Sequence, residues 1–237
     1  MKILLLYGDG TQAIPVIKQL YLTGHIVDAV AENKYGYGSN SRYLHKRYIF
    51  EDVEDVDKYY LYLNDLLKEE MYDVVIPMRD ENTKLLCKYR EELLRYTHFV
   101  VPDDDTFERG FDKHKLMEVC QKYGYPHPST VMVKGDGINE VDLSSLTFPI
   151  LIKPNHTAGG RGMTLIHSQE ELKEQFPSIY KQYGECHLQD YIPTGGSQVE
   201  VQLYVNEKRE LVNSSVIYKY RWYPENGGSS CCAKSGK

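Results

Sequence analysis

The chain has 237 residues, enough for one large domain or two modest domains. Hydrophobic residues make up 41% and charged residues 26%, and the net charge of −6 comes from interspersed acids and bases. This balance argues against a nucleic-acid-binding surface as the main function, and no segment approaches the ~20 apolar residues of a membrane span. The five cysteines show no C-x-x-C spacing. We therefore expect no zinc site or disulfide framework, and we expect a reducing cytoplasm.

The first ~105 residues have the pattern of a mostly parallel α/β domain. Residues 2–7 form a continuous apolar run, typical of a strand that is buried on both faces. A Gly8-Asp-Gly10 turn, a helix over 12–22 and a strand over 25–31 follow, which makes a βαβ unit. The same reasoning predicts helices over 57–70 and 83–95, and strands over 48–50, 73–77 and 99–102. The first of these helices has Tyr59, Leu63, Leu66 and Leu67 on one stripe.

The pattern changes at Asp112, which is a good N-cap for a helix that Gly124 ends. We expect the buried stripe of this helix to hold Leu116, Val119, Cys120 and Tyr123. Two prolines then favour extended chain into a strand over 129–133.

Residues 148–166 predict a strand, a Gly-rich loop and a second strand. The first apolar run ends on Lys153 and Pro154, and three glycines follow within 159–162. Glycine lets several backbone N–H groups turn toward one ligand, and a lysine at the mouth favours a polyanion. A nucleotide triphosphate is the first candidate, and an ordinary hairpin with a flexible tip is the alternative.

The last third of the chain reads as α+β with antiparallel strands. Ser168-x-x-Glu171 is a capping box that starts a helix to about Tyr183, and Pro177 is expected to kink or interrupt it. Strands are predicted over 186–192, 198–205 and 210–220, and a loop over 224–230. His114, His127, His156 and His187 have no partners at metal-ligand spacing, so we take them as structural or exposed.

One motif favours a different function. Gly8-Asp-Gly10-Thr-Gln-Ala13 fits the G-x-G-x-x-A pattern of a dinucleotide site, and Asp28 or Glu32 could hold a ribose. This predicts an NAD(P)-dependent oxidoreductase. However, no later segment looks like a hydride-transfer site, and a tight glycine turn after the first strand also suits this topology without any cofactor.

The order of motifs resembles the ATP-grasp superfamily, in the branch related to the carbamoyl-phosphate synthase large chain. The resemblance runs from about residue 1 to 230. It rests on short stretches in the right order: Ser41-Arg-Tyr43, Tyr48-Ile-Phe50, Asp73-Val-Val-Ile-Pro-Met-Arg-Asp-Glu81, Phe111-Asp-Lys113, Gly124-Tyr-Pro-His-Pro-Ser-Thr130, residues 148–166, Leu188-Gln-Asp-Tyr-Ile-Pro193, Lys219-Tyr-Arg221 and Tyr223-Pro224.

The resemblance implies an α/β chain with three parts. A Rossmann-like, parallel-sheet pre-ATP-grasp domain would cover 1–110, and the first α+β ATP-grasp lobe with its Gly-rich flap would cover 111–188. The second lobe would begin at 189 and remain incomplete at 237, because no Glu-x-Asn metal motif follows Arg221. We therefore expect a fragment, with the Mg²⁺ ligands beyond Lys237.

The resemblance also implies roles for single residues. Lys113 and Lys153 would contact the phosphates, and Arg221 would neutralise the transferred phosphoryl group. The flap over the β- and γ-phosphates would be His156, Thr157, Ala158, Gly159, Gly160, Arg161 and Gly162. The adenine hinge would be Gln189, Asp190, Tyr191 and Ile192, with Asp190 standing where the family usually has Glu. Gln198 or Glu200 would bind the ribose.

The implied activity is an ATP- and Mg²⁺-dependent carboxylate–amine or carboxylate–thiol ligase that forms an acyl phosphate. We expect small-molecule carboxylate and amine substrates, no nucleic acid and no membrane, and we leave open a homodimer. A catalytically inactive nucleotide-binding module is the main alternative, and the oxidoreductase is the weaker one.

Overall fold

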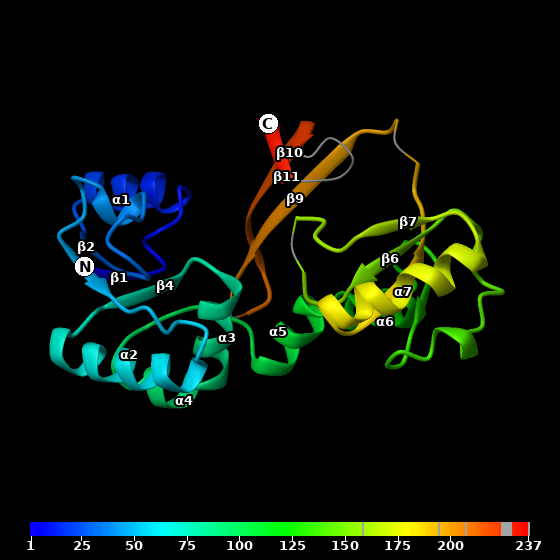
Figure 1. Ribbon diagram of the computed structural model, residues 1–237. Coiled ribbons are helices and arrows are strands. Elements are labelled where there is room, and N and C mark those ends of the chain that lie inside the picture. The colour runs from blue at the N-terminus through cyan, green and yellow to red at the C-terminus, as the bar shows by residue number, and fades with distance from the viewer. Residues whose placement is uncertain (158, 194, 207, 224–228, 237) are drawn as a thin grey trace. The chain divides into compact units, whose positions relative to one another are not determined.

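A computed structural model describes residues 1–157, 159–193, 195–206, 208–223 and 229–236. The chain divides into two compact units, Met1–Phe111 and Asp112–Lys237 (Figure 1). Each unit has buried apolar clusters of its own.

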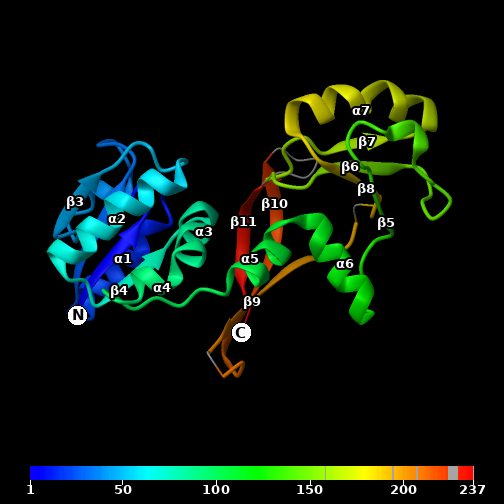
Figure 2. The ribbon, with the colours of Figure 1, turned by 90° about the horizontal axis from the view of Figure 1, so that it is seen from below.

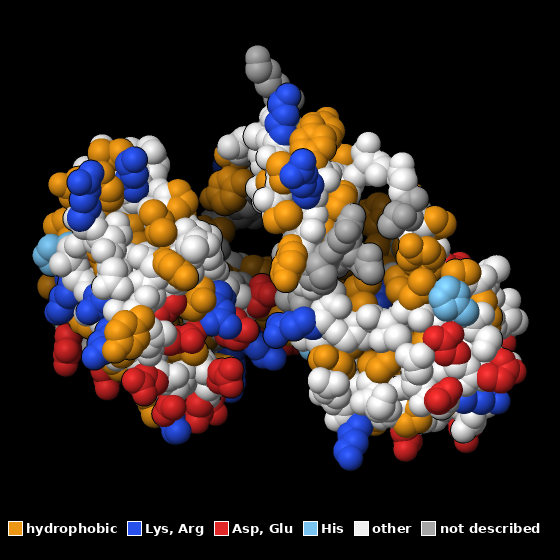
Figure 3. Space-filling view, turned by 45° about the horizontal axis from the view of Figure 1, so that its top comes forward, with side chains coloured by type: hydrophobic (Ala, Val, Ile, Leu, Met, Phe, Trp, Pro, Cys, Tyr) orange, Lys and Arg blue, Asp and Glu red, His pale blue; other side chains and the backbone are white. Residues whose placement is uncertain are grey.

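Acidic and basic side chains are interspersed on the face that Figure 3 shows. None of the described helices is long and apolar enough to cross a membrane.

The first unit is built on a parallel sheet with the order β3-β2-β1-β4. The strands are β1 (Lys2–Leu6), β2 (Ile26–Ala31), β3 (Lys46–Ile49) and β4 (Val74–Pro77), with a short 3₁₀ turn η1 (Gly38–Asn40). Leu4 lies opposite Asp28 on one side and Val75 on the other, so β1 is central. Ile3 to Leu6 are at most 2% exposed. The predicted parallel α/β fold is confirmed.

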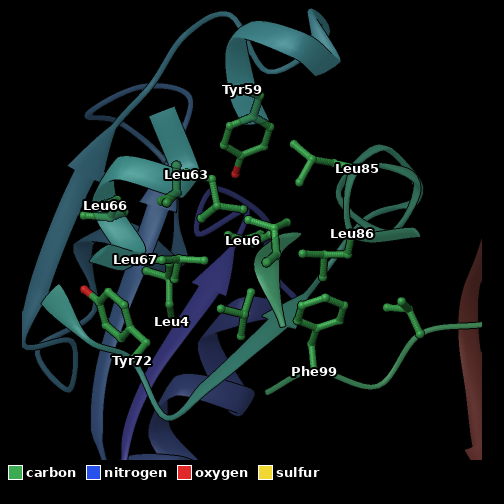
Figure 4. Packing of buried hydrophobic residues seen from close by; sticks show 14 of the residues in the cluster. Leu4, Leu6, Tyr59, Leu63, Leu66, Leu67, Tyr72, Leu85, Leu86 and Phe99 are labelled. Carbon is green, nitrogen blue, oxygen red and sulfur yellow. The ribbon is translucent and has the colours of Figure 1, made fainter. Parts of the chain in front are cut away.

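Helices cover both faces of this sheet. α1 (Ala13–Leu22) packs on Ile3 and Leu5 from one side. α2 (Val56–Glu70), α3 (Asp80–Lys88) and α4 (Arg90–Leu93) pack on Leu4 and Leu6 from the other side. Figure 4 shows Tyr59, Leu63, Leu66 and Leu67 of α2 turned into that core, as their helical spacing predicted.

Two elements of the first unit differ from prediction. The helix over 83–95 begins at Asp80 and is broken at Tyr89. The strand over 99–102 is wrong, because only His98 forms a bridge to Val74. The predicted segment ends at Pro102, which has no N–H to donate to a neighbouring strand. Two carbonyl groups of the segment accept hydrogen bonds from side chains instead. Cys87 donates to Pro102 and Arg90 donates to Val101. Helix α5 (Asp104–Phe111), which follows, was not predicted.

The second unit contains two antiparallel sheets. β5 (Thr130–Met132), β6 (Ile150–Pro154), β7 (Thr164–Ile166) and β8 (Cys186–Asp190) form the first, in the order β5-β8-β6-β7. α7 (Gln169–Tyr183) covers one face through Leu172 and Phe176 (Figure 2). α6 (Lys113–Tyr123) contacts the other face, where Gln189 donates to Met117. The second sheet has the order β11-β10-β9, with β9 (Gln198–Val205), β10 (Leu211–Tyr223) and β11 (Ser229–Ser235). A 3₁₀ turn η2 (Ile138–Glu140) lies between β5 and β6.

Helix ends follow the capping rules. Asp112 accepts from the main-chain N–H groups of His114 and Lys115, and Gly124 ends α6 with φ +69°. Ser168 accepts from Glu171 N, and Glu171 accepts from His167 N. These caps confirm both predicted helix starts.

Other expectations for the second unit are corrected. α7 runs through Pro177 without interruption, since buried Phe176 and Ile179 anchor the turns on either side. The predicted stripe of α6 is not buried: Leu116 is 38% and Tyr123 60% exposed. β11 was missed, and residues 224–228 of the expected loop lie outside the described residues.

The α2 packing gives a matched pair of substitutions. Leu63 is fully buried and Leu61, on the same helix, is 61% exposed. Leu63→Ala should lower the free energy of unfolding of the first unit by about 2–5 kcal/mol, because it leaves a cavity. Leu61→Ala should change it by no more than about 0.5 kcal/mol. Urea denaturation followed by circular dichroism measures both, and equal effects would contradict this packing.

Candidate functional site

Two lysines from different elements meet at one end of β6. The main-chain N–H of Lys113, the first residue of α6, donates to Asn155 O at 3.4 Å, which docks the start of the helix beside the strand end. The Lys113 ammonium donates to the same carbonyl at 3.1 Å and to Thr157 O. Lys153 lies two residues before Asn155. We call Lys113 and Lys153 the lysine pair.

Lys153 lies in a largely buried and polar place. Its ammonium donates to Gln189 Oε1 at 2.8 Å, and Gln189, only 5% exposed, donates onward to Thr130 Oγ1 at 2.9 Å. Burial and the charge of Lys113 both lower the pKa of Lys153. Like charges that are desolvated together repel each other, so an anion that contacts both ammonium groups would be stabilised here.

The Gly-rich segment 156–162, which we call the flap, begins at the lysine pair. His156 Nε2 lies 3.2 Å from the carboxylate of Asp112, the N-cap of α6, and Thr157 Oγ1 donates to Arg161 O at 2.8 Å. Gly162 has φ +74°, and a Cβ there would lie 2.8 Å from Pro154 Cγ and from the Tyr183 ring. Gly159 and Gly160 also have positive φ, while Ala158 lies outside the described residues.

The predicted hinge straddles the end of β8. Gln189 and Asp190 are in the strand, whereas Tyr191 and Ile192 lie beyond it, and Ile192 is 66% exposed. Asp190 is fixed on both sides: its N–H donates to Ser129 O at 3.0 Å, and its carboxylate accepts from Thr147 N at 3.0 Å. The short side chain of Asp190 therefore braces the loop before β6.

A cavity of about 500 Å³ is lined by Gly159 of the flap and by residues of the second sheet. Its polar walls include Gln198 and Glu200 of β9, both predicted site residues. Glu200 forms an ion pair with Lys219 at 2.7 Å, and Gln198 accepts from the indole N–H of Trp222. The cavity is lined by Gly159, Gln198, Glu200, Ile217, Lys219, Trp222, Ser230 and Ala233.

Arg221 lies next to this cavity in sequence but is not one of its lining residues. β10 carries register shifts between Lys219 and Arg221 and again between Arg221 and Trp222. Such bulges break the two-residue alternation of a strand, so Lys219 and Trp222 share the cavity face and Arg221 pairs with Cys232. Sequence reasoning missed Lys219 and Trp222. Lys219 is two residues from Ile217, so strand alternation could have placed both on one face. Nothing in the sequence indicates the bulge that brings Trp222 to the same face.

The residues of the dinucleotide motif serve the packing of the first unit. Asp28 is fully buried, accepts from Tyr72 OH at 2.6 Å, and lies 2.9 Å from His45 Nδ1, so it cannot reach a ribose. Gly38 sits against the glycine turn, where a Cβ on it would lie 2.6 Å from Ala13 Cβ and 2.7 Å from Gly8 O.

Glu32, the other ribose candidate, is paired with Arg79 at 2.5 Å. Burial raises the pKa of Glu32, and the Arg79 guanidinium opposes that rise. With Asp28 enclosed and Glu32 paired, these contacts favour a structural role for the glycine turn.

A buried histidine lies beside Lys153 on the same face of the sheet. His187 is 0% exposed and lies opposite Lys153 in the ladder between β6 and β8. Its Nδ1 lies 2.8 Å from Asn155 Oδ1. Burial, together with the charge of Lys153, lowers the pKa of His187 to about 4. The imidazole is therefore neutral at pH 7.

Comparison with known proteins finds relatives of this chain. Residues 112–213 match the family described as carbamoyl-phosphate synthase L chain, ATP binding domain. A formate-dependent phosphoribosylglycinamide formyltransferase of Ignicoccus hospitalis is 28% identical over 180 residues, which cover 75% of this chain and 42% of that protein. A D-aspartate ligase of Enterococcus faecium is 27% identical over 154 residues, which cover 58% and 36%.

A solved structure shows the same fold. The biotin carboxylase domain dimer of Hydrogenobacter thermophilus 2-oxoglutarate carboxylase, in complex with MgADP, ADP and bicarbonate, superposes with a TM-score of 0.69 and 20% identity. The match covers 95% of this chain and 51% of that one.

These matches confirm the resemblance to the ATP-grasp superfamily, and the chain has that fold. The chain spans less than half the length of the two curated relatives.

His187 makes stability depend on pH in a defined direction. Its pKa is about 4 in the folded protein and near 6.5 when unfolded, so the unfolded chain binds more protons in acid. The stability that this group contributes is complete above pH 6.5 and is lost as the pH falls toward 4. The difference corresponds to roughly 3 kcal/mol. Urea titrations of the second unit's transition between pH 4 and 7 should show this slope.

His187→Gln should flatten the slope, because the amide does not titrate. His98→Gln, at an exposed position of the first unit, is the matched control and should leave it unchanged. An unaltered slope in His187→Gln would contradict the neutral, buried state of this histidine.

Proposed function

We propose that the protein binds ATP at the lysine pair and the adjoining cavity, and acts in ATP-dependent carboxylate–amine or carboxylate–thiol ligation through an acyl phosphate. One observation carries the proposal: two ammonium groups from α6 and β6 share a partly buried place at the root of a Gly-rich flap. Such a site suits a triphosphate, since its charge offsets the repulsion between the lysines.

Roles for the remaining residues follow the same scheme. Lys113 and Lys153 would hold the phosphates, and main-chain N–H groups of 156–162 would cover them. Main-chain groups of Gln189 to Ile192 would pair with adenine, and Gln198 or Glu200 would bind the ribose. Arg221 would neutralise the transferred phosphoryl group. Lys219 and Trp222 join this set because they line the cavity.

The chemistry needs no protein nucleophile. A carboxylate oxygen of the substrate would attack the γ-phosphorus, the bond to the β–γ bridging oxygen would break, and ADP would leave. An amine or thiol would then add to the acyl phosphate, lose its proton and expel inorganic phosphate. Catalysis of phosphoryl transfer is mainly positioning and charge neutralisation, which lysines, an arginine and backbone N–H groups supply.

Mg²⁺ would accompany ATP, as in the MgADP complex of the Hydrogenobacter enzyme. Among the described residues no group of three or more His, Cys, Asp or Glu could hold a metal ion, so we assign no Mg²⁺ ligand here. The substrates would be small molecules, and a homodimer would parallel that enzyme's dimeric domain. The five cysteines are free, which supports a reducing cytoplasmic location.

The test of activity is release of ADP and phosphate. The protein is incubated with MgATP and pairs drawn from panels of carboxylates and amines or thiols. Stimulated release with one pair, and a new amide or thioester seen by mass spectrometry, is the expected result. ATP binding without any release would favour the catalytically inactive module. Stabilisation by NAD with no response to ATP would overturn both readings.

The single tryptophan gives a direct binding assay, because Trp222 lines the cavity. ATP should change its fluorescence. Lys153→Ala should weaken ATP binding about 10- to 100-fold, since it removes a charge-assisted contact worth about 1.5–3 kcal/mol.

Lys181→Ala, at an exposed position of α7, is the matched control and should bind ATP like the unchanged protein. Equal ATP affinity of Lys153→Ala and Lys181→Ala would show that the lysine pair is not the phosphate site.

A further inference from the structure

Asn155 links the two lysines. Its carbonyl accepts from both the main chain and the side chain of Lys113. Lys153 is joined to it through a single intervening residue, Pro154. A shift of Asn155 would therefore move the Lys113 ammonium relative to that of Lys153.

Asn155 is hydrogen-bonded to His187 of β8 and to Glu185, the residue before that strand. Its N–H donates to Glu185 O at 2.9 Å, and its side chain, in a residue only 1% exposed, meets His187 Nδ1 at 2.8 Å. An amide oxygen can only accept a hydrogen bond, so His187 Nδ1 carries the proton and Nε2 keeps its lone pair. Both contacts fix the end of β6 just where the flap begins.

His187 has no other polar anchor among the described residues. Nε2 is buried without a hydrogen-bond partner, and Nδ1 of His114 is in the same state. The centroids of these two rings are 6.5 Å apart. A buried nitrogen without a partner costs free energy, so its presence in a folded protein calls for an explanation. The charged and titratable groups that act on the His187 ring are Lys153 of β6, with Lys113, His114 and Asp112 at the start of α6.

We propose that His187 is a positioning residue for the triphosphate: through Asn155 it sets the separation between the ammonium groups of Lys113 and Lys153. A neutral imidazole can lie beside two cations without adding a third charge. This inference rests on the proposed function, in which the lysine pair binds the phosphates. It adds a residue that touches no ligand and yet selects for a polyphosphate.

The test compares ligands with and without phosphates. His187→Leu removes the hydrogen bond and keeps the bulk of the side chain. ATP affinity, followed by Trp222 fluorescence, should fall about tenfold, the lower end of the loss seen when a partner that orients a metal ligand is removed. Adenosine affinity, followed by ligand-observed NMR, should change less than about twofold. His187→Gln, whose amide can donate to Asn155, should restore most of the ATP affinity.

Cys186→Ala is the matched control. Cys186 is the preceding residue of β8, equally buried, and belongs to the apolar cluster under α7 on the opposite face. It should lower stability and leave the ratio of ATP to adenosine affinity unchanged. If His187→Leu fails to fold, Asn155→Ala removes the same hydrogen bond while the main-chain carbonyl remains, and the same selective loss of ATP affinity is expected.

The outcomes separate the two claims. Unchanged ATP affinity in His187→Leu and Asn155→Ala, or a proportional loss of ATP and adenosine affinity, would overturn the positioning role alone. Failure of the unchanged protein to bind ATP would overturn the proposed function, and this inference with it.

Discussion

The candidate site of the second unit depends on one unfavourable contact, the repulsion between two ammonium groups. Lys113 and Lys153 are forty residues apart in sequence, yet main-chain hydrogen bonds bring them to the same strand end. This arrangement is unfavourable in isolation, since burial and a like charge both penalise the protonated form of Lys153. It persists because the N-cap of α6, the central position of β6 and the polar face beneath them are all fixed independently. A protein that maintains such a pair gains from it when a polyanion is present.

Much of the fold could be predicted because its signals are local. The unbroken apolar run of β1, the four-residue stripe of α2 and the caps at Asp112 and Ser168 each depend on a few adjacent residues. The failures have a common cause. Residues 99–102 have the composition of a strand, but tertiary contacts from Cys87 and Arg90 take their carbonyls. Composition does not show which donors the rest of the fold will deliver.

The candidate site shows the same division. The lysines and the glycines stand out in the sequence because their types and spacing suit a phosphate ligand. His187 and Asn155 do not, since nothing in their neighbourhood indicates that they meet across two strands. The glycine turn at Gly8 gives the opposite lesson. Its spacing fits a dinucleotide site, while the structure uses it to admit Gly38 at close range. Close approach is the same physical requirement in both cases, and only the contacts show what approaches.

The irregularity of β10 has a consequence for how this cavity could diverge among related chains. A strand that alternates strictly can exchange a wall residue only by substitution. Here each strand of the β10–β11 pair carries one extra residue near Arg221, so Lys219 and Trp222 line the same cavity although they are three residues apart. A change in chain length that removed one of these irregularities would alter which side chains face the cavity without changing any of them chemically. Insertions and deletions are therefore a second route, besides point mutation, to a new lining for this pocket.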